Sequence, residues 1–345
     1  LGFWMRKSNL NKMKAEFQEK NSDKIKLSRG IVFHIAPSNI NTIFMYSLVA
    51  SMLLGNKNIV RVSGKDSIQK DLLVRNLNTL LEQQEFSTLN QYLTIVSYNY
   101  SRDINQFFSS HCNARVIWGG DTTVSDVSES LLPPNAIDVK FANKYSLAVL
   151  STKALAELTD DEFNNLAQKF ITDSYSFGQM ACSSPRTVYW LGGEHKQEER
   201  FWFFVHKKLQ FIEHNISEAD FINKYVYVCN HAIKCNSKHR NFLKDNLISC
   251  VVTNINNSLD FEEHCGAGLF IESRIDSLYD LTPLLDRRIQ TVTYFGLEKQ
   301  ELTTWLLSGL NGIDRVVPVG SALDFDIIWD GMNLTEFLTR EISLY

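Results

Sequence analysis

The chain has 345 residues, of which 44% are apolar and 21% charged, and its formal net charge at pH 7 is −4. This length and apolar content suffice for one large core or two moderate ones, so we expect two subdomains and no extended disorder. Interspersed acidic and basic residues, and the lack of an apolar run near the roughly 18 residues that cross a bilayer, argue against nucleic acid or a membrane as partner and favour a small-molecule ligand.

The cysteines and the N-terminal residues indicate the cellular compartment in which the protein is expected to work. Six cysteines, at positions 112, 182, 229, 235, 250 and 265, show no compact disulfide spacing. We expect thiols in a reducing cytoplasm, because a chain of this length does not need disulfides for stability. Residues 1–7 contain no hydrophobic segment of a secretory signal, and the initial Leu1 in place of Met leads us to expect that part of the natural N-terminus is missing.

Short apolar runs alternate with longer amphipathic segments along the chain, which indicates strand–helix–strand units around a mostly parallel sheet. Ile31–Ile35 is predicted to be a buried strand. Ser38 or Asn39 is expected to cap the following helix, which stops at residues 55–56. A strand at residues 58–62 follows. The pattern therefore predicts an α/β fold.

The next helix is predicted from apolar residues at helical spacing on one face, which should pack on the sheet: Ile68, Leu72, Leu73, Leu77, Leu80 and Leu81. Residues 92–98 and 114–118 are predicted strands, separated by an amphipathic segment around Phe107. Residues 133–135, Pro-Pro-Asn, interrupt the pattern before a strand at 145–150. We place a domain boundary near residue 150.

The second part of the chain mixes helices and strands. A helix is expected to begin with a capping box of Thr159 and Glu162, and strands are predicted at 187–191 and 290–295. No internal repeat or low-complexity tract is present. A second α/β domain is therefore expected.

Two strand-to-helix turns are candidate anion sites, although the chain contains no G-x-G-x-x-G or Walker A sequence. Ser38-Asn39 is expected at the N-terminus of a helix, whose amides favour an anion or a developing oxyanion. Residues 119–123, Gly-Gly-Asp-Thr-Thr, form a turn in which exposed amides could hold a pyrophosphate. An ordinary connection is the alternative for either turn taken alone.

Cys182 stands in a turn of small residues, FGQMACSSP at 177–185, before a predicted strand. Substrate could approach a thiol closely there, and the alternative is a buried structural cysteine. Cys265 follows His264 and precedes a Gly-Ala-Gly sequence. Neighbours along a strand point to opposite faces, so His264 is not expected to act as its base, and we interpret Cys265 as a packing or turn residue.

Three further features favour a structural interpretation. A loose Cys/His cluster lacks a CxxC pair and is interrupted by a predicted strand at Tyr225–Val228, so no metal site is predicted: Cys229, His231, Cys235 and His239. His34 is expected to be a core histidine bonded to backbone. Phe201–Phe204 is expected to form a buried helix wall, with an acyl-chain pocket as the alternative.

Six segments in order together resemble the acyl-CoA reductases of the aldehyde dehydrogenase superfamily, especially the fatty acyl reductases of bacterial luminescence. They are FHIAPSNINTIF, LLGNKNIVRVS, VIWGGD, QMACSSPR, LDRRIQTV and RVVPVGSALDFDIIWDG, and the resemblance covers nearly the whole chain. It implies an aldehyde dehydrogenase-like α/β fold. It places a Rossmann-type nicotinamide-cofactor domain at 1–150, a catalytic cysteine domain at 151–320 and a C-terminal segment at 321–345 with a possible oligomerisation strand.

The resemblance also implies the roles of individual residues. Cys182 would be the nucleophile, and the Asn39 side-chain amide would stabilise the oxyanion together with the Cys182 backbone N–H. The implied cofactor contacts are Ala36, Pro37, Ser38, Arg61, Ser63, Lys65, Gly119, Gly120 and Asp121. Arg61 with Lys65 nearby suits a 2′-phosphate, which favours NADPH (NADP) over NADH (NAD).

The chain departs from the superfamily pattern at the water-activating base. Aldehyde-oxidising members carry Glu-Leu-Gly-Gly-Lys where this chain reads Lys-Phe-Ala-Asn-Lys at 140–144, so Lys140 replaces the acid. Without that base an acyl group on Cys182 should resist hydrolysis. The chain shows two other departures: the Gln-to-Cys spacing is one residue longer than in aldehyde oxidisers, and the ribose-binding Glu has no clear counterpart near Asp286.

The resemblance thus implies NAD(P)H-dependent reduction of an acyl thioester, acyl-CoA or acyl-protein, to an aldehyde through acyl-Cys182. The alternatives are an NAD(P)-dependent aldehyde dehydrogenase that forms acid, a non-reducing acyl carrier or scaffold, and a cofactor-free cysteine hydrolase. The implied partners are an acyl-protein synthetase and further copies of the chain in a homo-oligomer, for which Leu334–Tyr345 would supply an exchanged strand.

Overall fold

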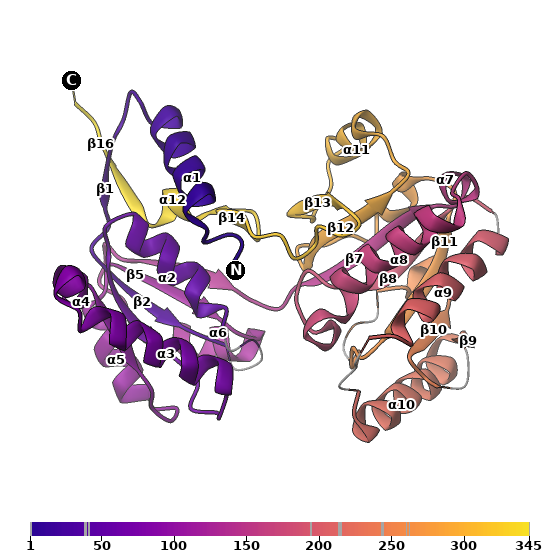
Figure 1. The fold of residues 1–345 in the computed structure, drawn as a ribbon, viewed down its shortest axis with the longest axis horizontal. Helices are drawn as coiled ribbons and strands as arrows, with labels where there is room; N and C mark the ends of the chain where they lie inside the picture. The colour runs from indigo at the N-terminus through magenta and orange to yellow at the C-terminus, as the bar shows by residue number, and fades with distance from the viewer. Residues whose placement is uncertain are drawn as a thin grey trace. The chain divides into compact units, whose positions relative to one another are not determined.

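A computed structural model describes residues 2–37, 40, 42–193, 195–212, 216–242, 245–259, 261 and 263–344 (Figure 1). The chain forms two compact units, one of residues 1–143 with 325–345 and the other of residues 144–324. The first unit thus ends before residue 150, because strand β7, Tyr145–Ser151, is a middle strand of the second unit's sheet. The C-terminal segment also begins later than expected, at residue 325, where the chain re-enters the first unit.

The first unit contains a five-stranded parallel sheet in the order β4-β3-β2-β5-β6. Its strands are β2 Ile31–Ile35, β3 Lys57–Arg61, β4 Leu93–Val96, β5 Ala114–Trp118 and β6 Ile137–Phe141. The chain starts at the central strand β2, runs outward through β3 and β4, and then crosses back to β5 and β6. The strand order therefore reverses between β2 and β5, which is where open α/β sheets bind ligands beyond the carboxyl ends of their strands.

Helices cover both faces of this sheet. On one face, α2 (Phe44–Leu53) and α3 (Ile68–Leu81) pack on β3 and β4, and on the other α5 (Arg102–His111) and α6 (Asp121–Ser128) pack on β2 and β5. The predicted apolar face of α3 is confirmed in part: Leu73, Leu77 and Leu81 pack on the sheet, but Ile68, Leu72 and Leu80 are exposed. The α2 helix begins at Phe44, later than predicted, because residues 42 and 43 form a turn in which the Ile43 N–H donates to the Ile40 carbonyl (3.2 Å).

His34 lies in the core, as predicted, but its partners are side chains and not backbone. Its ring nitrogens lie 3.1 Å from Ser47 Oγ and 3.0 Å from Asn58 Oδ1. Burial lowers the pKa of His34 to about 4, so the ring is neutral at pH 7 and ties β2 to α2 and β3.

The N- and C-terminal segments complete the first unit. Helix α1 (Lys7–Lys20) precedes β1 (Ile25–Ser28), and β1 pairs antiparallel with β16 (Thr339–Ile342). The returning chain also contains β14 (Ile328–Trp329), β15 (Met332–Asn333) and α12 (Leu334–Phe337). Within the segment expected to exchange between subunits, Leu334–Phe337 form α12 and Thr339–Ile342 form a strand that pairs within the same chain.

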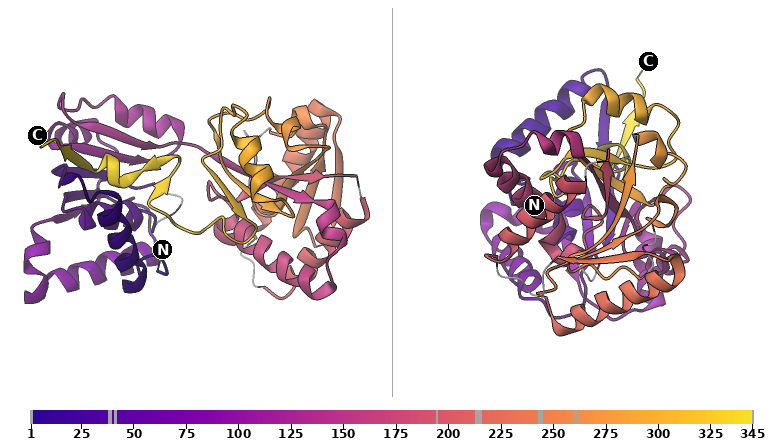
Figure 2. Two further views of the ribbon diagram at one scale, coloured as in Figure 1. Left: turned by 90° about the horizontal axis from the view of Figure 1, so that it is seen from above. Right: turned by 90° about the vertical axis from the view of Figure 1, so that its right-hand side faces the viewer.

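The second unit contains a seven-stranded sheet in the order β13-β12-β7-β8-β11-β10-β9. Figure 2 shows the ribbon from two further sides. Its remaining strands are β8 Pro185–Leu191, β9 Lys238–Phe242, β10 Ile248–Val252, β11 Leu269–Ile275, β12 Ile289–Phe295 and β13 Arg315–Pro318. Only β9 of these described strands is antiparallel to its neighbour. The α/β fold class predicted from the sequence is confirmed.

Helices also cover both faces of the second sheet. The α8 helix (Asp160–Tyr175) and α9 (His195–Leu209) contribute to one core, and α10 (Glu218–Cys235) and α11 (Lys299–Leu306) to the other. The predicted capping box of Thr159 and Glu162 opens α8. In the predicted aromatic wall on α9, Phe203 is exposed and the other three side chains are buried. Further short helices are α4 Ser87–Asn90, α7 Thr152–Ala156, η1 Gln84–Phe86, η2 Ser176–Gln179, η3 Ile255–Asn257 and η4 Leu278–Leu281.

The strand predicted at Tyr225–Val228 is wrong, because these residues lie inside α10. Tyr227 and Val228 are buried on the sheet side of that helix, whereas Tyr225 and Val226 are exposed. The nearby Cys/His cluster spans this helix and β9, and His231 Nδ1 lies 2.9 Å from Ser237 Oγ. The described residues contain no group of three or more His, Cys, Asp or Glu side chains arranged to hold a metal ion.

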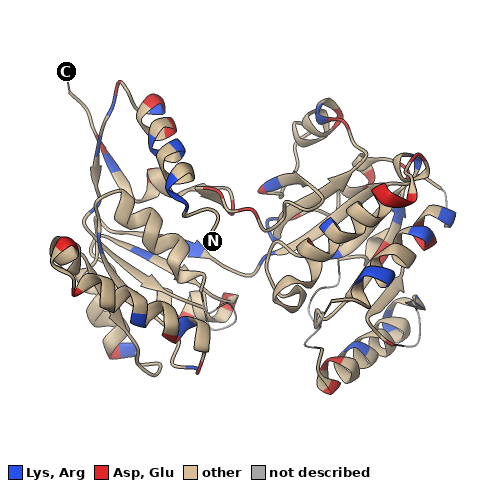
Figure 3. Cartoon of the chain, viewed as in Figure 1, with Lys and Arg blue, Asp and Glu red and all other residues tan. Residues whose placement is uncertain are grey.

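Charged residues of both signs are interspersed along the chain in both units (Figure 3). Within the described residues, no helix combines the length and apolar character that a membrane crossing requires.

Candidate functional site

Cys182 follows a backbone turn of unusual conformation between α8 and β8. Phe177, Gly178 and Gln179 have φ values of 56°, 61° and 66°, so three consecutive residues are left-handed and two of them carry a side chain. Left-handed backbone costs a residue with a Cβ roughly 1–2 kcal/mol. Cys182 is half-buried at the end of this turn, and its carbonyl accepts a hydrogen bond from Ser146 Oγ on β7 (2.6 Å).

The Gln179 side chain is fully buried and holds the turn to two strands. Its Nε2 donates to the carbonyls of Pro185 (3.0 Å) and Leu269 (2.8 Å), at the starts of β8 and β11. Its Oε1 accepts from the Gly268 N–H (2.9 Å). The side-chain amide of Gln179 therefore holds the turn before Cys182 to the backbone of β8 and to the backbone at the start of β11.

A second left-handed turn packs against the first. Gly266, Ala267 and Gly268 have φ values of 72°, 53° and 82°. The Ala267 N–H donates to the Gly178 carbonyl (3.0 Å). A Cβ added to Gly266 would stand 2.4 Å from the same Gly178 oxygen and 3.0 Å from Met180 Sδ, so a larger residue at 266 cannot be accommodated without a shift of the turn.

Arg186, on β8, is the cation nearest in sequence to the thiol, and its side chain is buried. Its guanidinium lies over the Tyr145 ring at 4.9 Å from the centroid, and one of its nitrogens is 4.0 Å from Met180 Sδ. Burial lowers the pKa of Arg186, while the nearby Tyr145, Cys182, Cys265 and Tyr227 act in the opposite direction. In the part of the chain that the structure describes, the buried Arg186 Nε has no hydrogen-bond partner. A buried guanidinium of this kind favours a negative charge on the groups around it.

His264 and Cys265 lie beside this turn but not in a strand, so the strand-based reason for setting His264 aside is wrong. His264 Nδ1 accepts from the Gly266 N–H (3.2 Å), and burial together with Arg186 lowers its pKa well below the usual range. Burial raises the pKa of the Cys265 thiol. A half-buried cysteine with a raised pKa agrees with its interpretation as a packing or turn residue.

The glycine turn predicted for the pyrophosphate follows β5 in the first unit. Gly120 is the N-cap of α6, and a Cβ on Gly119 would stand 2.9 Å from Thr123. The Asp121 carboxylate accepts from the Asn143 N–H (3.1 Å). This turn lies at the carboxyl end of the strand where the sheet order reverses, and the first amides of α6 have no acceptor within the helix.

The predicted contacts after β2 and β3 lie at the same edge of the sheet. Ala36 is buried, and its N–H donates to the Arg61 carbonyl (3.0 Å), while Pro37 is half-buried. Ser38 and Asn39 lie outside the described residues. The sheet therefore brings the segment at 36–37 next to Arg61.

Arg61, Ser63 and Lys65 follow β3. The Arg61 guanidinium lies over the Tyr98 ring (5.3 Å) and donates to the Tyr98 carbonyl (3.3 Å). Ser63 is buried and Lys65 is exposed. Lys70, which was not predicted, fixes this loop: its buried Nζ donates to the carbonyls of Ser63 (2.9 Å) and Lys65 (2.6 Å).

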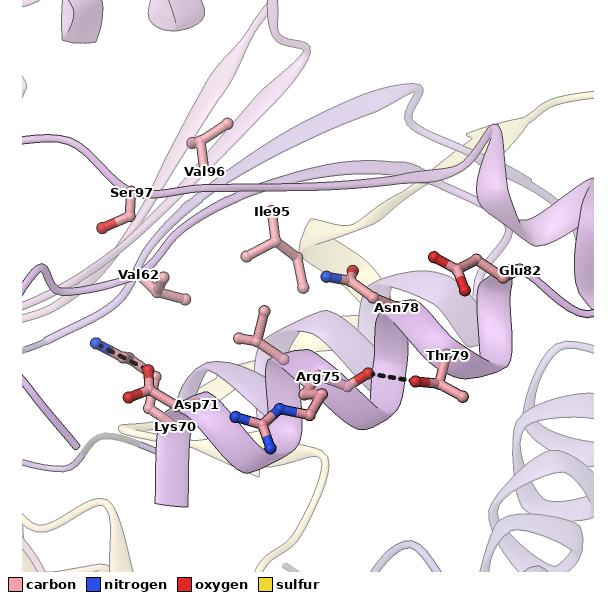
Figure 4. Close-up of a pocket in the computed structure, with 11 residues that line it drawn as sticks. Val62, Lys70, Asp71, Arg75, Asn78, Thr79, Glu82, Ile95, Val96 and Ser97 are labelled. Carbon is pink, nitrogen blue, oxygen red and sulfur yellow. Dashed lines mark hydrogen bonds and ion pairs between the residues drawn. The ribbon is translucent and has the colours of Figure 1, made fainter. Parts of the chain in front are cut away.

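A cavity of about 520 Å³ lies between α3 and the ends of β3 and β4 (Figure 4). Val62 and Lys70, which flank the predicted contacts, are among the lining residues. The others are Asp71, Val74, Arg75, Asn78, Thr79, Glu82, Ile95, Val96 and Ser97.

Comparison with known families identifies the chain. The model of the family described as acyl-CoA reductase (LuxC) matches residues 9–340. The chain belongs to the acyl-CoA reductase (LuxC) family. A long-chain acyl-protein thioester reductase of Aliivibrio fischeri is 21% identical over 166 residues, which are 48% of this chain and 32% of that relative. The match therefore spans about a third of the length of that relative.

Solved structures show that this LuxC-family chain has the aldehyde dehydrogenase fold. An aldehyde dehydrogenase from Brucella melitensis biovar abortus 2308 matches with a TM-score of 0.68 at 12% identity, over 92% of this chain and 69% of that chain. An NAD-dependent benzaldehyde dehydrogenase from Corynebacterium glutamicum matches with a TM-score of 0.63 at 12% identity, over 92% and 68%.

Proposed function

We propose that the chain catalyses the reduction of an acyl thioester to an aldehyde by NADPH or NADH, with Cys182 as the covalent acyl carrier. The observation that carries the proposal is the match to the acyl-CoA reductase family over residues 9–340. In this chain Cys182 follows a turn that Gln179 holds to backbone, and the buried Arg186 comes four residues later. The aldehyde dehydrogenase fold and the name of the Aliivibrio fischeri relative support it.

In this mechanism the Cys182 thiolate attacks the carbonyl carbon of the thioester. The bond from that carbon to the carrier sulfur breaks, the carrier leaves as a thiolate that takes up a proton, and the acyl group stays on Cys182. A nicotinamide cofactor, when bound, supplies the hydride that reduces this acyl carbon. The resulting thiohemiacetal then re-forms its carbonyl, breaks the bond to sulfur and releases aldehyde and the Cys182 thiolate. Asn39 and the Cys182 backbone N–H would stabilise the oxyanions.

The first unit fits a dinucleotide. Its sheet reverses order between β2 and β5, and Gly120 opens α6 with amides suited to a phosphate. Residues that would hold the cofactor are Ala36, Pro37, Ser38, Arg61, Ser63, Lys65, Gly119, Gly120 and Asp121. Arg61 and Lys65 would favour the 2′-phosphate of NADPH over NADH.

Lys140, which stands in place of the water-activating Glu, favours reduction of the acyl group over its hydrolysis to acid. Lys140 lies on β6 with its Nζ 3.7 Å from Asp138 Oδ2. That carboxylate already accepts two hydrogen bonds from Arg115, at 2.7 and 2.8 Å, so it is held in a structural ion pair. With a lysine at 140, the hydrolysis of acyl-Cys182 would be slow, and the acyl group would persist until it is reduced.

We further propose that the acyl group arrives on CoA or from an acyl-protein synthetase, that the chain works in a reducing cytoplasm, and that it forms a homo-oligomer. All six cysteines are thiols, which suits that compartment.

A two-directional assay tests the proposed function. Acyl-CoA of graded chain length is supplied with NADPH or NADH, and aldehyde with NADP or NAD, while the absorbance of the reduced cofactor is followed. We expect aldehyde from acyl-CoA, with NADPH preferred, and little acid from aldehyde. Formation of carboxylic acid as the main product, or acylation without consumption of reduced cofactor, would contradict the proposal. Cys182→Ser is the inactive control.

A further inference from the structure

We propose that Gln179 and the left-handed turn Gly266–Gly268 together form a positioning device that holds the Cys182 sulfur beside the Arg186 guanidinium. The inference deepens the proposed function, because it rests on Cys182 as the nucleophile. Among the described residues, the three hydrogen bonds of the Gln179 side chain all go to backbone atoms, so we assign it a positioning role and not a catalytic one.

The backbone that leads to Cys182 is strained. Phe177 and Gln179 adopt left-handed φ although both carry a Cβ. Strained backbone of this kind persists only where the surroundings fix it. Without added contacts, residues 177–179 would relax to right-handed or extended φ and carry Cys182 with them.

The contacts that hold this strained turn in place come in part from residues distant in the sequence. Gln179 makes three hydrogen bonds to backbone of β8, β11 and Gly268, at 2.8 to 3.0 Å. The Ala267 N–H holds the Gly178 carbonyl, and Gly266 provides the space that this carbonyl occupies. Each left-handed turn thus stabilises the other.

The positive charge of Arg186 lies close to this turn. Arg186 follows Cys182 by four residues and contacts Met180 in the same turn, and its side chain rests on the Tyr145 ring. The thiolate is the nucleophilic form of cysteine, whose unperturbed pKa is about 8.5. A displacement of the turn would move the Cys182 sulfur relative to the Arg186 guanidinium. The electrostatic stabilisation of a thiolate by that cation falls with distance.

Alkylation of Cys182 by iodoacetamide tests the proposal, because its rate reports the thiolate fraction. The rate is measured against pH in the full chain, and mass spectrometry of the peptide that contains Cys182 separates it from the other thiols. Two variants perturb the device independently. Gly266→Ala places a Cβ against the Gly178 oxygen, and Gln179→Glu removes the amide donors at nearly constant shape.

The matched control is Gly309→Ala. Gly309 is also left-handed, at φ 93°, but a Cβ there meets no atom within 4 Å, so this variant carries the conformational cost without a clash at the turn. We expect wild type and Gly309→Ala to share one midpoint of rate against pH. Gly266→Ala and Gln179→Glu should shift the midpoint upward by about one pH unit, a roughly tenfold slower alkylation below it.

An unchanged midpoint in a folded Gly266→Ala or Gln179→Glu variant would overturn the proposal, and near-ultraviolet circular dichroism establishes the folded state. If Gly266→Ala does not fold, Gln179→Glu decides. Alkylation needs neither acyl substrate nor cofactor. A shifted midpoint in a chain that lacks reductase activity would therefore count against the proposed function alone, and an unshifted midpoint in an active reductase against the positioning device alone.

Discussion

At the scale of single residues, the proposed chemistry depends most on the environment of Arg186. Its guanidinium is buried against Tyr145, and among the described residues it forms no ion pair with a carboxylate. A buried cation without a carboxylate favours any nearby group that can become an anion. The groups that act on it are two thiols, Cys182 and Cys265, and two phenols.

Replacement of Arg186 tests this environment. Arg186→Met keeps an unbranched side chain on the Tyr145 ring but removes the charge. We expect the alkylation of Cys182 at neutral pH to slow by about tenfold, because the thiolate fraction falls when the cation is lost. The exposed Arg288→Met is the control, and an alkylation rate equal in both variants would show that Arg186 does not act on the sulfur.

At the scale of elements, α8 ties the segment after Cys182 to the segment after β13. The Asp173 carboxylate on α8 accepts from the N–H groups of Gly320 (2.6 Å) and Ala322 (3.0 Å). The Asp173 carbonyl accepts from Ser184 Oγ (2.7 Å), two residues after Cys182. This helix end is therefore a common support for both segments.

Asp173 gives α8 a defined pH dependence. Burial raises its pKa from 3.8 to about 6. Between these values the folded chain keeps a proton that the unfolded chain has released, so the stabilising contribution of Asp173 is full below 3.8 and declines as the pH rises through about 6. The corresponding change in the free energy of unfolding is on the order of 3 kcal/mol.

Urea unfolding over this pH range tests the assignment. Asp173→Asn keeps the shape but does not titrate, so wild type should gain stability relative to this variant as the pH falls from about 6 to about 4. The exposed Asp161→Asn reports the background pH dependence. A difference between wild type and Asp173→Asn that stays constant with pH would place the Asp173 pKa near its ordinary value.

Some helices and strands could be predicted from the sequence and others could not. The strands at 31–35 and 114–118 were predicted with their observed bounds, because they are continuous apolar runs between helical segments. Tyr225–Val228 misled the prediction, since an aromatic and β-branched run is common in strands, yet helix α10 buries Tyr227 and Val228 and leaves Tyr225 and Val226 exposed. Tertiary packing decided the conformation there.

The candidate site was predicted less completely than the fold, for a physical reason. A local motif of small residues indicated Cys182, but the roles of Gln179 and Arg186 depend on contacts that short sequence patterns do not reveal. Gln179 bonds Gly268, which is 89 residues away. A basic residue four positions after the cysteine, in an otherwise apolar strand, is the one local signal that could have indicated Arg186.

At the scale of the whole molecule, the chain divides its candidate functions between two units. The first unit contains the sheet reversal and the glycine turn, and the second contains Cys182 with Arg186. The return of residues 325–345 to the first unit was not predicted, because β16 finds its partner β1 more than 300 residues earlier: the Arg29 side chain donates to the Thr339 carbonyl over a separation of 310 residues.

The central claim is that one sulfur accepts an acyl group and yields it as aldehyde. The most direct measurement is a single turnover. The chain is first incubated with acyl-CoA alone and mapped by mass spectrometry, and NADPH is then added and the product identified. We predict acyl mass on Cys182 that is stable without cofactor and is discharged as aldehyde when NADPH is added. Acyl mass on another residue, or discharge as carboxylic acid, would contradict the account.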